Sequence, residues 1–313
     1  MFRFFLCLLA CILSLAYLPG YAVAASFTDE SGKRFEVRKP FTRIISLYGG
    51  HTENLFALGS DKEIIGVSQS ENYPPQALQK PAFSYHEDAE KFMAARPDLV
   101  IIRPMIAASN PQFVEKLEKA GITVVSLQPV GISDMYEYWK NLGILTGKEE
   151  EARKMILKFQ QSLEKIAASV KTIPQDKRKR VYFEAIHDKM RTFAPDSVAI
   201  FVLTHAGGVN IASDAVQRKN TNIADFGKEK LLSRADDIDV YLAQSGTMNR
   251  ITADRIKTEP GFSAIRAIKD NQIYLIDELS VSRPTPRLLQ GIFDIGKILY
   301  PELFTDALWQ EIR

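Results

Sequence analysis

The side chains of this chain that could bind a ligand include four histidines. They are His51, His86, His187 and His205. His205 lies near the end of a predicted helix that a glycine pair closes, so it reads as an ordinary helix residue. A metal site needs about three or four His, Asp or Glu ligands that meet at one point. Three histidines on separate loops keep a free metal-ion binding protein open as an alternative.

Four arginines follow four predicted strands, and guanidinium groups bind carboxylate and catecholate oxygens well. They are Arg103, Arg191, Arg250 and Arg283. In open parallel sheets, ligands bind beyond the carboxyl ends of the strands. We therefore predict that these arginines converge on one cleft that favours an anionic ligand. A lone arginine is more often an ordinary surface residue.

Aromatic and imidazole side chains occupy other loops at the same predicted edge. The predicted ligand contacts among them are Tyr48, His51, Tyr85, His86 and His187. His51 could instead cap the helix that it opens, and the tyrosines could be packed rings with a hydrated hydroxyl. Gly49 and Gly50 would let a ligand approach the backbone closely.

The elements that must position these residues alternate between strand and helix. Apolar strands at residues 43–47, 63–67, 98–102 and 122–127 alternate with helices, and the pattern restarts at residue 180. Strands that are apolar on both faces indicate buried parallel sheets. The predicted fold is therefore α/β, with two Rossmann-like lobes whose central sheets are mostly parallel.

One long amphipathic helix separates the two halves, at about residues 148–171. Its apolar residues are Ala152, Met155, Ile156, Phe159, Leu163, Ile166, Ala167 and Val170. This spacing has the 3.6-residue period, and no Gly or Pro interrupts it. We predict a rigid rod of roughly 35 Å. The expected organisation is a lobe at 25–147, the interdomain helix at 148–172 and a second lobe at 173–313.

Residues 1–24 read as a secretory signal peptide. Arg3 precedes an apolar run, and Ala22-Val23-Ala24 is a small-x-small cleavage pattern. The apolar run is shorter than the roughly 20 residues that span a bilayer, which disfavours a membrane anchor. Cys11 ends a lipobox-like Leu-Leu-Ala-Cys, so a lipoprotein is an alternative. We predict cleavage near Ala24 and a periplasmic or extracytoplasmic location.

The composition excludes several classes of function. Both cysteines, Cys7 and Cys11, lie in the leader, so a chain that starts near Ala25 has no disulfide and no catalytic thiol. The net charge of +2, from 40 basic and 38 acidic residues, gives no reason to expect a nucleic-acid partner. No Gly-x-Ser-x-Gly, Gly-x-Gly-x-x-Gly or P-loop motif is present, so an enzyme is the weaker alternative.

Four segments resemble the periplasmic binding proteins for ferric siderophores, haem and cobalamin, whose lobes are joined by a long helix. They read TRIISLYGGHTENLFALGSDKEIIGVSQSENYP, HEDAEKFMAARPDLVIIRP, RTFAPDSVAIFVLTHAGGVNIA and SRPTPRLLQGIFDIGKILYPELF. The resemblance covers about residues 27–304. It implies a monomer without a resident cofactor that holds ligand in a shallow groove and closes only slightly.

The resemblance also implies delivery to an ABC permease with a cytoplasmic ATPase. In the family, one glutamate on each lobe faces arginines of the permease. The matching positions here are Glu90 and Glu229. Two carboxylates far apart on a rigid body would fix orientation as well as attraction. Without the resemblance, both would read as ordinary exposed helix charges, each near a helix start where an acid is favourable.

The resemblance does not carry over the identity of the ligand. The arginines favour an anionic iron–siderophore chelate. Aromatic clefts suit corrinoids, but neither Trp139 nor Trp309 falls on a predicted cleft loop, which disfavours cobalamin. Haem stays open, with Tyr48, Tyr85 or a histidine as axial ligand.

Overall fold

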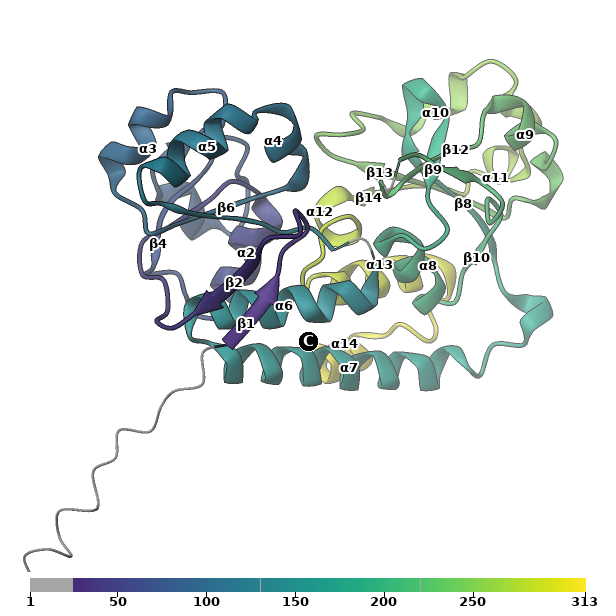
Figure 1. The fold of residues 1–313 in the computed structure, drawn as a ribbon. Helices are drawn as coiled ribbons and strands as arrows, with labels where there is room; N and C mark the ends of the chain where they lie inside the picture. Colours follow the sequence, from purple (N-terminus) through teal and green to yellow (C-terminus); the bar gives the residue numbers. More distant parts are fainter. Residues whose placement is uncertain (1–24, 130, 220) are drawn as a thin grey trace, which may run out of the picture.

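The computed structural model describes residues 25–129, 131–219 and 221–313. Figure 1 shows two α/β lobes side by side, with one long helix running beneath both. The predicted signal peptide, its cleavage site and the lipobox-like Cys11 lie outside the described residues. Within the described ranges, no helix combines the length and the apolar character that a membrane crossing requires.

The first lobe is built on a sheet of five parallel strands, as predicted. In spatial order the strands are β5 (Ala82–Phe83), β4 (Ile64–Ser68), β3 (Ile44–Ser46), β6 (Leu99–Ile102) and β7 (Thr123–Ser126). Every residue of β3 and β6 is buried, because helices cover both faces of the sheet. A short antiparallel hairpin, β1 (Ala25–Thr28) with β2 (Arg34–Val37), precedes this sheet.

Five helices of the first lobe surround its sheet. They are α2 (Gly49–Ala57), α3 (Ala89–Ala95), α4 (Pro104–Ser109), α5 (Pro111–Lys119) and α6 (Ile132–Thr146). Two of them, α3 and α5, begin at a side-chain cap. Asp88 accepts the Glu90 amide at the start of α3, and Asn110 accepts the Phe113 amide at the start of α5. Gly147 adopts a left-handed conformation (φ 66°) that ends α6.

The long helix predicted between the lobes is present as α7 (Glu149–Val170). Glu149, Glu150 and Glu151 occupy its first turn, where carboxylates interact favourably with the helix dipole. The C-terminal helix α14 (Asp306–Ile312) packs on α7. Ser162 and Lys165 of α7 donate hydrogen bonds of 2.7 and 2.8 Å to carbonyl oxygens of α14, which ties the end of the chain to the middle of α7.

The second lobe has a mixed sheet rather than a mostly parallel one. The strands are β8 (Arg180–Ile186), β9 (Arg191–Phe193), β10 (Val209–Asn210), β11 (Val216–Gln217), β12 (Ile223–Asp225), β13 (Val240–Ser245) and β14 (Ile273–Asp277). Strands β10, β8, β13 and β14 run parallel, whereas β9, β12 and β11 pair antiparallel. A 3-10 turn at His187–Lys189, followed by Met190 at φ 46°, reverses the chain between β8 and β9.

The remaining helices belong to this second half of the chain. They are α8 (Val198–His205), α9 (Lys228–Leu232), α10 (Ala253–Thr258), α11 (Arg266–Lys269), α12 (Glu278–Val281) and α13 (Leu288–Leu299). In Figure 1, α9, α10 and α11 lie in the upper part of the lobe, whereas α8, α12 and α13 lie near its base, towards α7.

The two lobes are joined at their base by an interlobe clasp, formed by Glu53 and Asn54 of α2 with Pro284, Thr285 and Arg287 from before α13. Thr285 Oγ1 and Arg287 Nε donate to Glu53 Oε1 at 3.0 and 2.9 Å, and Asn54 Nδ2 donates to the Pro284 oxygen at 3.0 Å. Burial raises the pKa of Glu53, and the charge of Arg287 opposes that shift. The clasp therefore holds α2 of the first lobe against the segment before α13.

Candidate ligand-binding cleft

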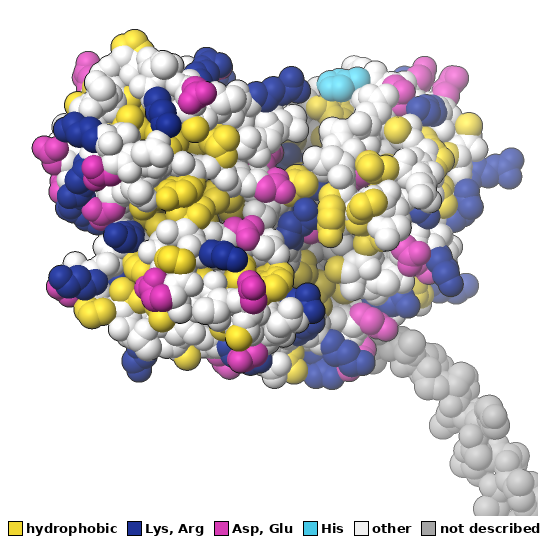
Figure 2. Space-filling view, turned by 180° about the vertical axis from the view of Figure 1, so that it is seen from behind, with side chains coloured by type: hydrophobic (Ala, Val, Ile, Leu, Met, Phe, Trp, Pro, Cys, Tyr) yellow, Lys and Arg dark blue, Asp and Glu magenta, His cyan; other side chains and the backbone are white. Residues whose placement is uncertain are grey.

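A hollow of about 270 Å³ lies between the lobes above the clasp. Its walls come from one residue of the first lobe and two loops of the second. The residues are Asn72, Gly246, Thr247, Arg250, Asp277, Glu278, Leu279 and Arg283. The rear view in Figure 2 shows the groove between the lobes, open at the upper edge of the molecule. The loops after β13 and β14 supply most of this wall, at the strand edge that the sheet rule indicates.

Arg283 connects the two lobes at this hollow. Its guanidinium donates to Asn72 Oδ1 at 2.8 Å and lies 4.0 and 3.9 Å from carboxylate oxygens of Glu53 and Glu71. A Cβ on Gly49 would lie 2.6 Å from the guanidinium carbon. The missing side chain of Gly49 therefore makes room for Arg283, not for a ligand as the sequence suggested.

Arg103 and Tyr48 form a second cationic feature on the first lobe. The Arg103 guanidinium lies over the Tyr48 ring, 4.6 Å from its centroid, and Arg103 Nε donates to Gln128 at 2.8 Å. Burial raises the pKa of Tyr48, while the charges of Arg103 and Arg283 oppose the rise. Tyr48 therefore stays a neutral phenol, and the charges of two arginines act on it. Its ring fills the space that a side chain on Gly50 would need.

The four predicted arginines separate into two groups. Arg250 and Arg283 line the same hollow, and Arg103 reaches Tyr48 beside Arg283. Arg191 does not join them, because it donates to Asp225 at 2.9 Å across the β9–β12 ladder. The structure does not place Arg191 at this hollow, and its contact with ligand stays a prediction.

The carboxylates of the hollow are already engaged by backbone amides. Asp277 accepts the Leu279 amide at 2.9 Å as the cap of α12, and Glu278 accepts the Met248 amide at 2.9 Å. Arg250 is exposed, and among the described residues no carboxylate pairs with it. The hollow therefore offers an unpaired cation beside Arg283, an arrangement that can bind an anion.

His51 is not available to a ligand. Its ring is fully buried, with Nε2 3.2 Å from the Ile102 oxygen and Nδ1 2.7 Å from the Tyr138 hydroxyl. Both ring nitrogens are thus used inside the first lobe, and the side chain does not cap α2. The predicted ligand contact is wrong because α2 turns this face of its first turn towards α6.

Tyr85 and His86 lie on the first lobe ahead of α3. Their rings pack against each other with centroids 4.0 Å apart; His86 is exposed and Tyr85 is half-buried. Asn110 donates to the Tyr85 oxygen at 3.0 Å and so fixes the loop that carries both rings. Their contact with ligand stays a prediction.

His187 is a buried residue of the second lobe and not a side chain at the cleft surface. Its Nδ1 lies 2.8 Å from Glu184 Oε2, and its amide donates to Asn249 Oδ1 at 2.9 Å. It is 2% exposed, so the predicted direct contact with ligand is wrong. His205 contacts the Phe201 oxygen at 2.9 Å at the end of α8, as expected of a helix residue.

The structure does not bring the candidate metal ligands together. His51 is inside the first lobe, His86 on its surface and His187 inside the second lobe. In the part of the chain that the structure describes, no three His, Cys, Asp or Glu side chains are grouped so that they could hold a metal ion.

The sequence did not predict several of the residues that line the cleft. Asn72, Thr247, Asp277 and Glu278 line the hollow, but none has a spacing or residue type that marks it as a contact. Asp277 ends β14 and Glu278 directly follows it, so the strand-end rule could have indicated them. Asn72 lies on a loop that only the three-dimensional arrangement brings to Arg283.

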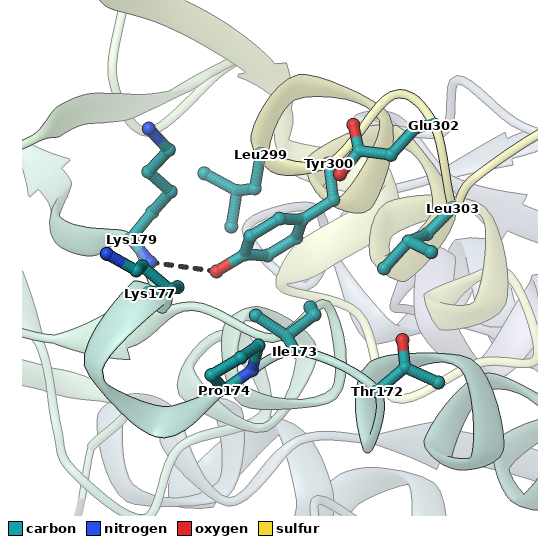
Figure 3. Close-up of a pocket in the computed structure, with 9 residues that line it drawn as sticks. All are labelled: Thr172, Ile173, Pro174, Lys177, Lys179, Leu299, Tyr300, Glu302 and Leu303. Atoms are coloured by element: carbon teal, nitrogen blue, oxygen red, sulfur yellow. Dashed lines mark hydrogen bonds between the residues drawn. The ribbon is translucent and has the colours of Figure 1, made fainter.

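A second hollow, of about 510 Å³, lies away from the cleft at the far end of α7 (Figure 3). Tyr300 points into it, and its hydroxyl accepts the Lys179 amide at 2.8 Å and donates to the Gly207 oxygen at 3.1 Å. The Lys179 side chain points away. This hollow lies where the ends of α7 and α13 meet the start of β8, and the Tyr300 hydroxyl inside it already has two hydrogen-bond partners.

The proposed docking glutamates are exposed, one on each lobe. Glu90 is the second residue of α3 and Glu229 the second residue of α9. Figure 1 places α3 and α9 in the upper parts of the two lobes, on the side opposite α7. Both glutamates therefore belong to the side on which the cleft opens.

Two α/β lobes, a rigid connecting helix and an interlobe hollow define a solute-binding protein of the helix-linked type. The sequence profile of the periplasmic binding protein family matches residues 44–279, and the chain belongs to this family. The members of this family are solute-binding proteins and not enzymes.

Similar proteins cover nearly the whole chain. An uncharacterized ABC transporter substrate-binding lipoprotein, YvrC, of Bacillus subtilis is 25% identical over 281 residues, which are 89% of this chain and 86% of that protein. A vitamin B12-binding protein of Vibrio cholerae is 25% identical over 259 residues, which are 81% and 88% of the two chains.

A solved structure shares the same architecture. It is a possible iron-binding, periplasmic solute-binding protein from Staphylococcus epidermidis, with a TM-score of 0.70 and 27% identity. The alignment covers 84% of this chain and all of that one. The expected fold class is confirmed.

Proposed function

We propose that this chain is the extracytoplasmic solute-binding protein of an ABC importer, and that it captures an anionic metal chelate of the ferric-siderophore type. The unpaired Arg250 beside Arg283 in the interlobe hollow is the observation that supports this ligand class. Arg103 over Tyr48 adds a third guanidinium on the facing lobe. Carboxylate or catecholate oxygens would match these donors.

Cobalamin is the second candidate, because relatives of similar length are vitamin B12-binding proteins. The tryptophans give it no support. Trp139 is fully buried, and Trp309 lines a hollow of about 400 Å³ behind the clasp, with Phe56, Phe159 and Arg287. Neither ring can stack on a corrin in the cleft.

The ligand is tested by isothermal titration calorimetry of residues 25–313 against ferric siderophores, haem, cobalamin and free zinc, manganese and iron. Calorimetry is preferred to tryptophan quenching because neither tryptophan faces the cleft. We expect sub-micromolar binding of a ferric siderophore and no binding of bare metal. Tight binding of cobalamin alone would select the second candidate, and tight binding of bare metal would contradict both.

Substitution of the cleft arginines tests where that ligand binds. Arg250→Ala and Arg103→Ala should each weaken the binding of an anionic chelate by about 1–3 kcal/mol, the contribution of a charge-assisted hydrogen bond. Arg191→Ala is the matched control, because it removes an arginine that pairs with Asp225 away from the hollow. Equal losses in all three variants would show that affinity follows overall charge and not the cleft.

We further propose that Glu90 and Glu229 dock the loaded protein on the permease, whose ATPase drives import. Replacing both with lysine should abolish uptake and leave ligand affinity unchanged, because both lie on helix surfaces outside the hollow. Glu164→Lys, an exposed reversal on α7, is the control and should transport normally. A matching loss of ligand affinity in the double variant would contradict docking.

The proposed location is the periplasm or the outer face of the membrane, reached by a leader that is cleaved near Ala24. The Bacillus relative is named a lipoprotein, which keeps a tether through Cys11 as the alternative to a free protein. Mass spectrometry of the exported chain distinguishes the two, because a free protein begins near Ala25 and a tethered one begins at a lipidated Cys11.

A further inference from the structure

The interior of the second lobe holds a polar network at the end of β8. Glu184 accepts hydrogen bonds from the Tyr241 hydroxyl and from Asn249 Nδ2, the latter at 3.1 Å, and it faces His187 Nδ1 at 2.8 Å. Glu184 and Tyr241 are fully buried, and His187 and Asn249 nearly so. Burial of an ionisable group costs free energy unless the group is paired, and each ionisable group of this network has a polar partner.

One end of the network reaches the ligand-binding hollow. Asn249 lies in the loop of residues 246–250, and Gly246, Thr247 and Arg250 of this loop line the hollow. Asn249 Oδ1 accepts the His187 amide at 2.9 Å, and Asn249 Nδ2 also donates to the Gln244 oxygen at 2.9 Å. Asn249, which contacts His187, therefore helps to position the loop, together with Glu278, which accepts the Met248 amide.

The other end of the network reaches α9. His187 Nε2 lies 3.6 Å from Glu259 Oε2, and Glu259 Oε1 accepts Lys228 Nζ at 2.6 Å. Lys228 is the first residue of α9 and Glu229 is the second. A backbone bond runs in parallel, from the Gly227 amide to the Met190 oxygen at 3.2 Å, and Met190 ends the turn that His187 begins.

The chemistry of the imidazole determines whether the two ends are connected. Glu184 and Glu259 present carboxylate oxygens to opposite ring nitrogens of His187. A carboxylate only accepts hydrogen bonds, and a neutral imidazole has a single N–H. The ring can attract both carboxylates at once only as the imidazolium, so one proton decides whether the side-chain path from Asn249 to Lys228 is continuous, whereas the backbone bond does not depend on it.

We propose that His187 is a positioning residue that couples the cleft loop, residues 246–250, to the docking helix α9. When a ligand moves the loop, this path changes the position of α9. It therefore moves Glu229, the residue proposed to contact the permease. The coupling rests on the proposed docking function for its biological meaning, but the mechanical link can be measured without permease or ligand. Coupling of this kind requires one element with two arrangements that both sites influence, and the two protonation states of His187 would supply them.

The link depends on pH in a defined direction. Burial lowers the pKa of His187, but the hydrogen bond with Glu184 and the charges of Glu184 and Glu259 raise it more, so the pKa lies above its usual value of 6.5. Arg255 on α10 opposes the rise, and Tyr182, Tyr241 and Lys228 are further ionisable groups around the network. The link is therefore complete at and below pH 6.5 and is lost as the pH rises through the raised pKa.

Hydrogen–deuterium exchange of residues 25–313 tests the coupling. In the wild-type protein we expect protection factors in residues 228–232 and 246–251 to fall together, by about fivefold or more, as the pH rises through the pKa of His187. An NMR titration of the His187 ring gives that pKa independently. In His187→Gln both segments should be poorly protected at every pH, and the pH dependence should disappear.

Two further variants make the outcome decisive. His205→Gln changes another histidine of the same lobe and should behave like the wild type. Glu259→Gln breaks the path at its more exposed end, so it should loosen residues 228–232 and lower the pKa of His187, even if His187→Gln fails to fold. Unchanged protection of residues 228–232 in His187→Gln or in Glu259→Gln would overturn the coupling. Normal uptake by the Glu90→Lys/Glu229→Lys variant would instead overturn docking and leave the coupling intact.

Discussion

At the residue scale, His51 shows how a chemically capable side chain becomes a structural one. The Ile102 oxygen can only accept a hydrogen bond, so Nε2 of His51 must carry the proton. Nδ1 then accepts from the Tyr138 hydroxyl, which in turn accepts from Asn54 Nδ2 at 3.3 Å. This chain of donors fixes the neutral tautomer and connects α2, α6 and β6.

This arrangement predicts a pH-dependent contribution to stability. Burial lowers the pKa of His51 to about 3. Because the unfolded value is about 6.5, the contribution is complete above pH 6.5 and is lost as the pH falls, at about 1.4 kcal/mol per pH unit. Between pH 7.5 and pH 5, the wild type should therefore lose about 2 kcal/mol more free energy of unfolding than His51→Gln.

Urea unfolding at the two pH values measures that difference. His86→Gln is the control, because His86 is exposed on the same lobe and should show the wild-type pH dependence. Identical pH dependence in wild type and His51→Gln would show that protonation of His51 does not destabilise the folded protein. It would contradict the neutral tautomer that this chain of hydrogen bonds requires.

At the element scale, α6 and α2 hold the segment before α13 through one carbonyl. Trp139 Nε1 of α6 and Asn54 Nδ2 of α2 both donate to the Pro284 oxygen at 3.0 Å. Trp139 is fully buried, and Phe159 of α7 packs edge-on against its ring with centroids 5.3 Å apart. One indole therefore joins an element of each lobe to the connecting helix.

Trp139→Phe should lower the free energy of unfolding by about 2–3 kcal/mol, from a small cavity and a lost hydrogen bond to a buried carbonyl. Circular dichroism during urea unfolding measures the loss. Trp309→Phe should cost about 1 kcal/mol or less, because Trp309 is half-buried on α14. Equal costs for the two variants would mean that the Pro284 contact adds nothing to stability.

The same scale shows what the sequence could and could not predict. The 3.6-residue period of α7 and the apolar runs of β3, β4, β6 and β7 are local patterns, and the structure has these elements within a few residues of their predicted bounds. The antiparallel strands β9, β11 and β12 are only two or three residues long, too short for any periodicity to be read.

The site was harder to predict because burial is not a local property. The strand-end rule brought Arg250 and Arg283 to one hollow, but it equally selected His51 and His187, which packing turns into the interior. Arg191 lies at a strand that runs antiparallel, so the rule for parallel sheets did not apply to it. Asn72 reaches the hollow only because Arg283 crosses from the other lobe.

At the scale of the whole molecule, one hydrophobic core runs from the first lobe through α7 into the second. It includes Leu55, Trp139, Phe159, Phe183 and Leu288. Together with the interlobe clasp, this continuity restricts relative motion of the lobes, because close-packed interiors do not deform smoothly.

Small-angle X-ray scattering should therefore detect little closure. With the chelate that calorimetry identifies, the radius of gyration should change by less than about 1 Å. Glu53→Leu/Arg287→Leu removes both charges of the clasp at once, so no unpaired charge is left buried, and should permit a larger change. A large change already in the wild-type protein would contradict the restriction.

The clasp also constrains how this architecture can be recombined. Residues 284–287 and α14 come from the end of the chain, yet they complete the surroundings of α2 and α7. A hybrid that joins the first 147 residues of this chain to the second half of a relative would therefore separate Glu53 and Asn54 from the partners selected with them. To exchange ligand specificity between relatives, we expect that the loops around Arg250 and Asp277 must be transplanted while the interlobe clasp and α14 are kept from one protein.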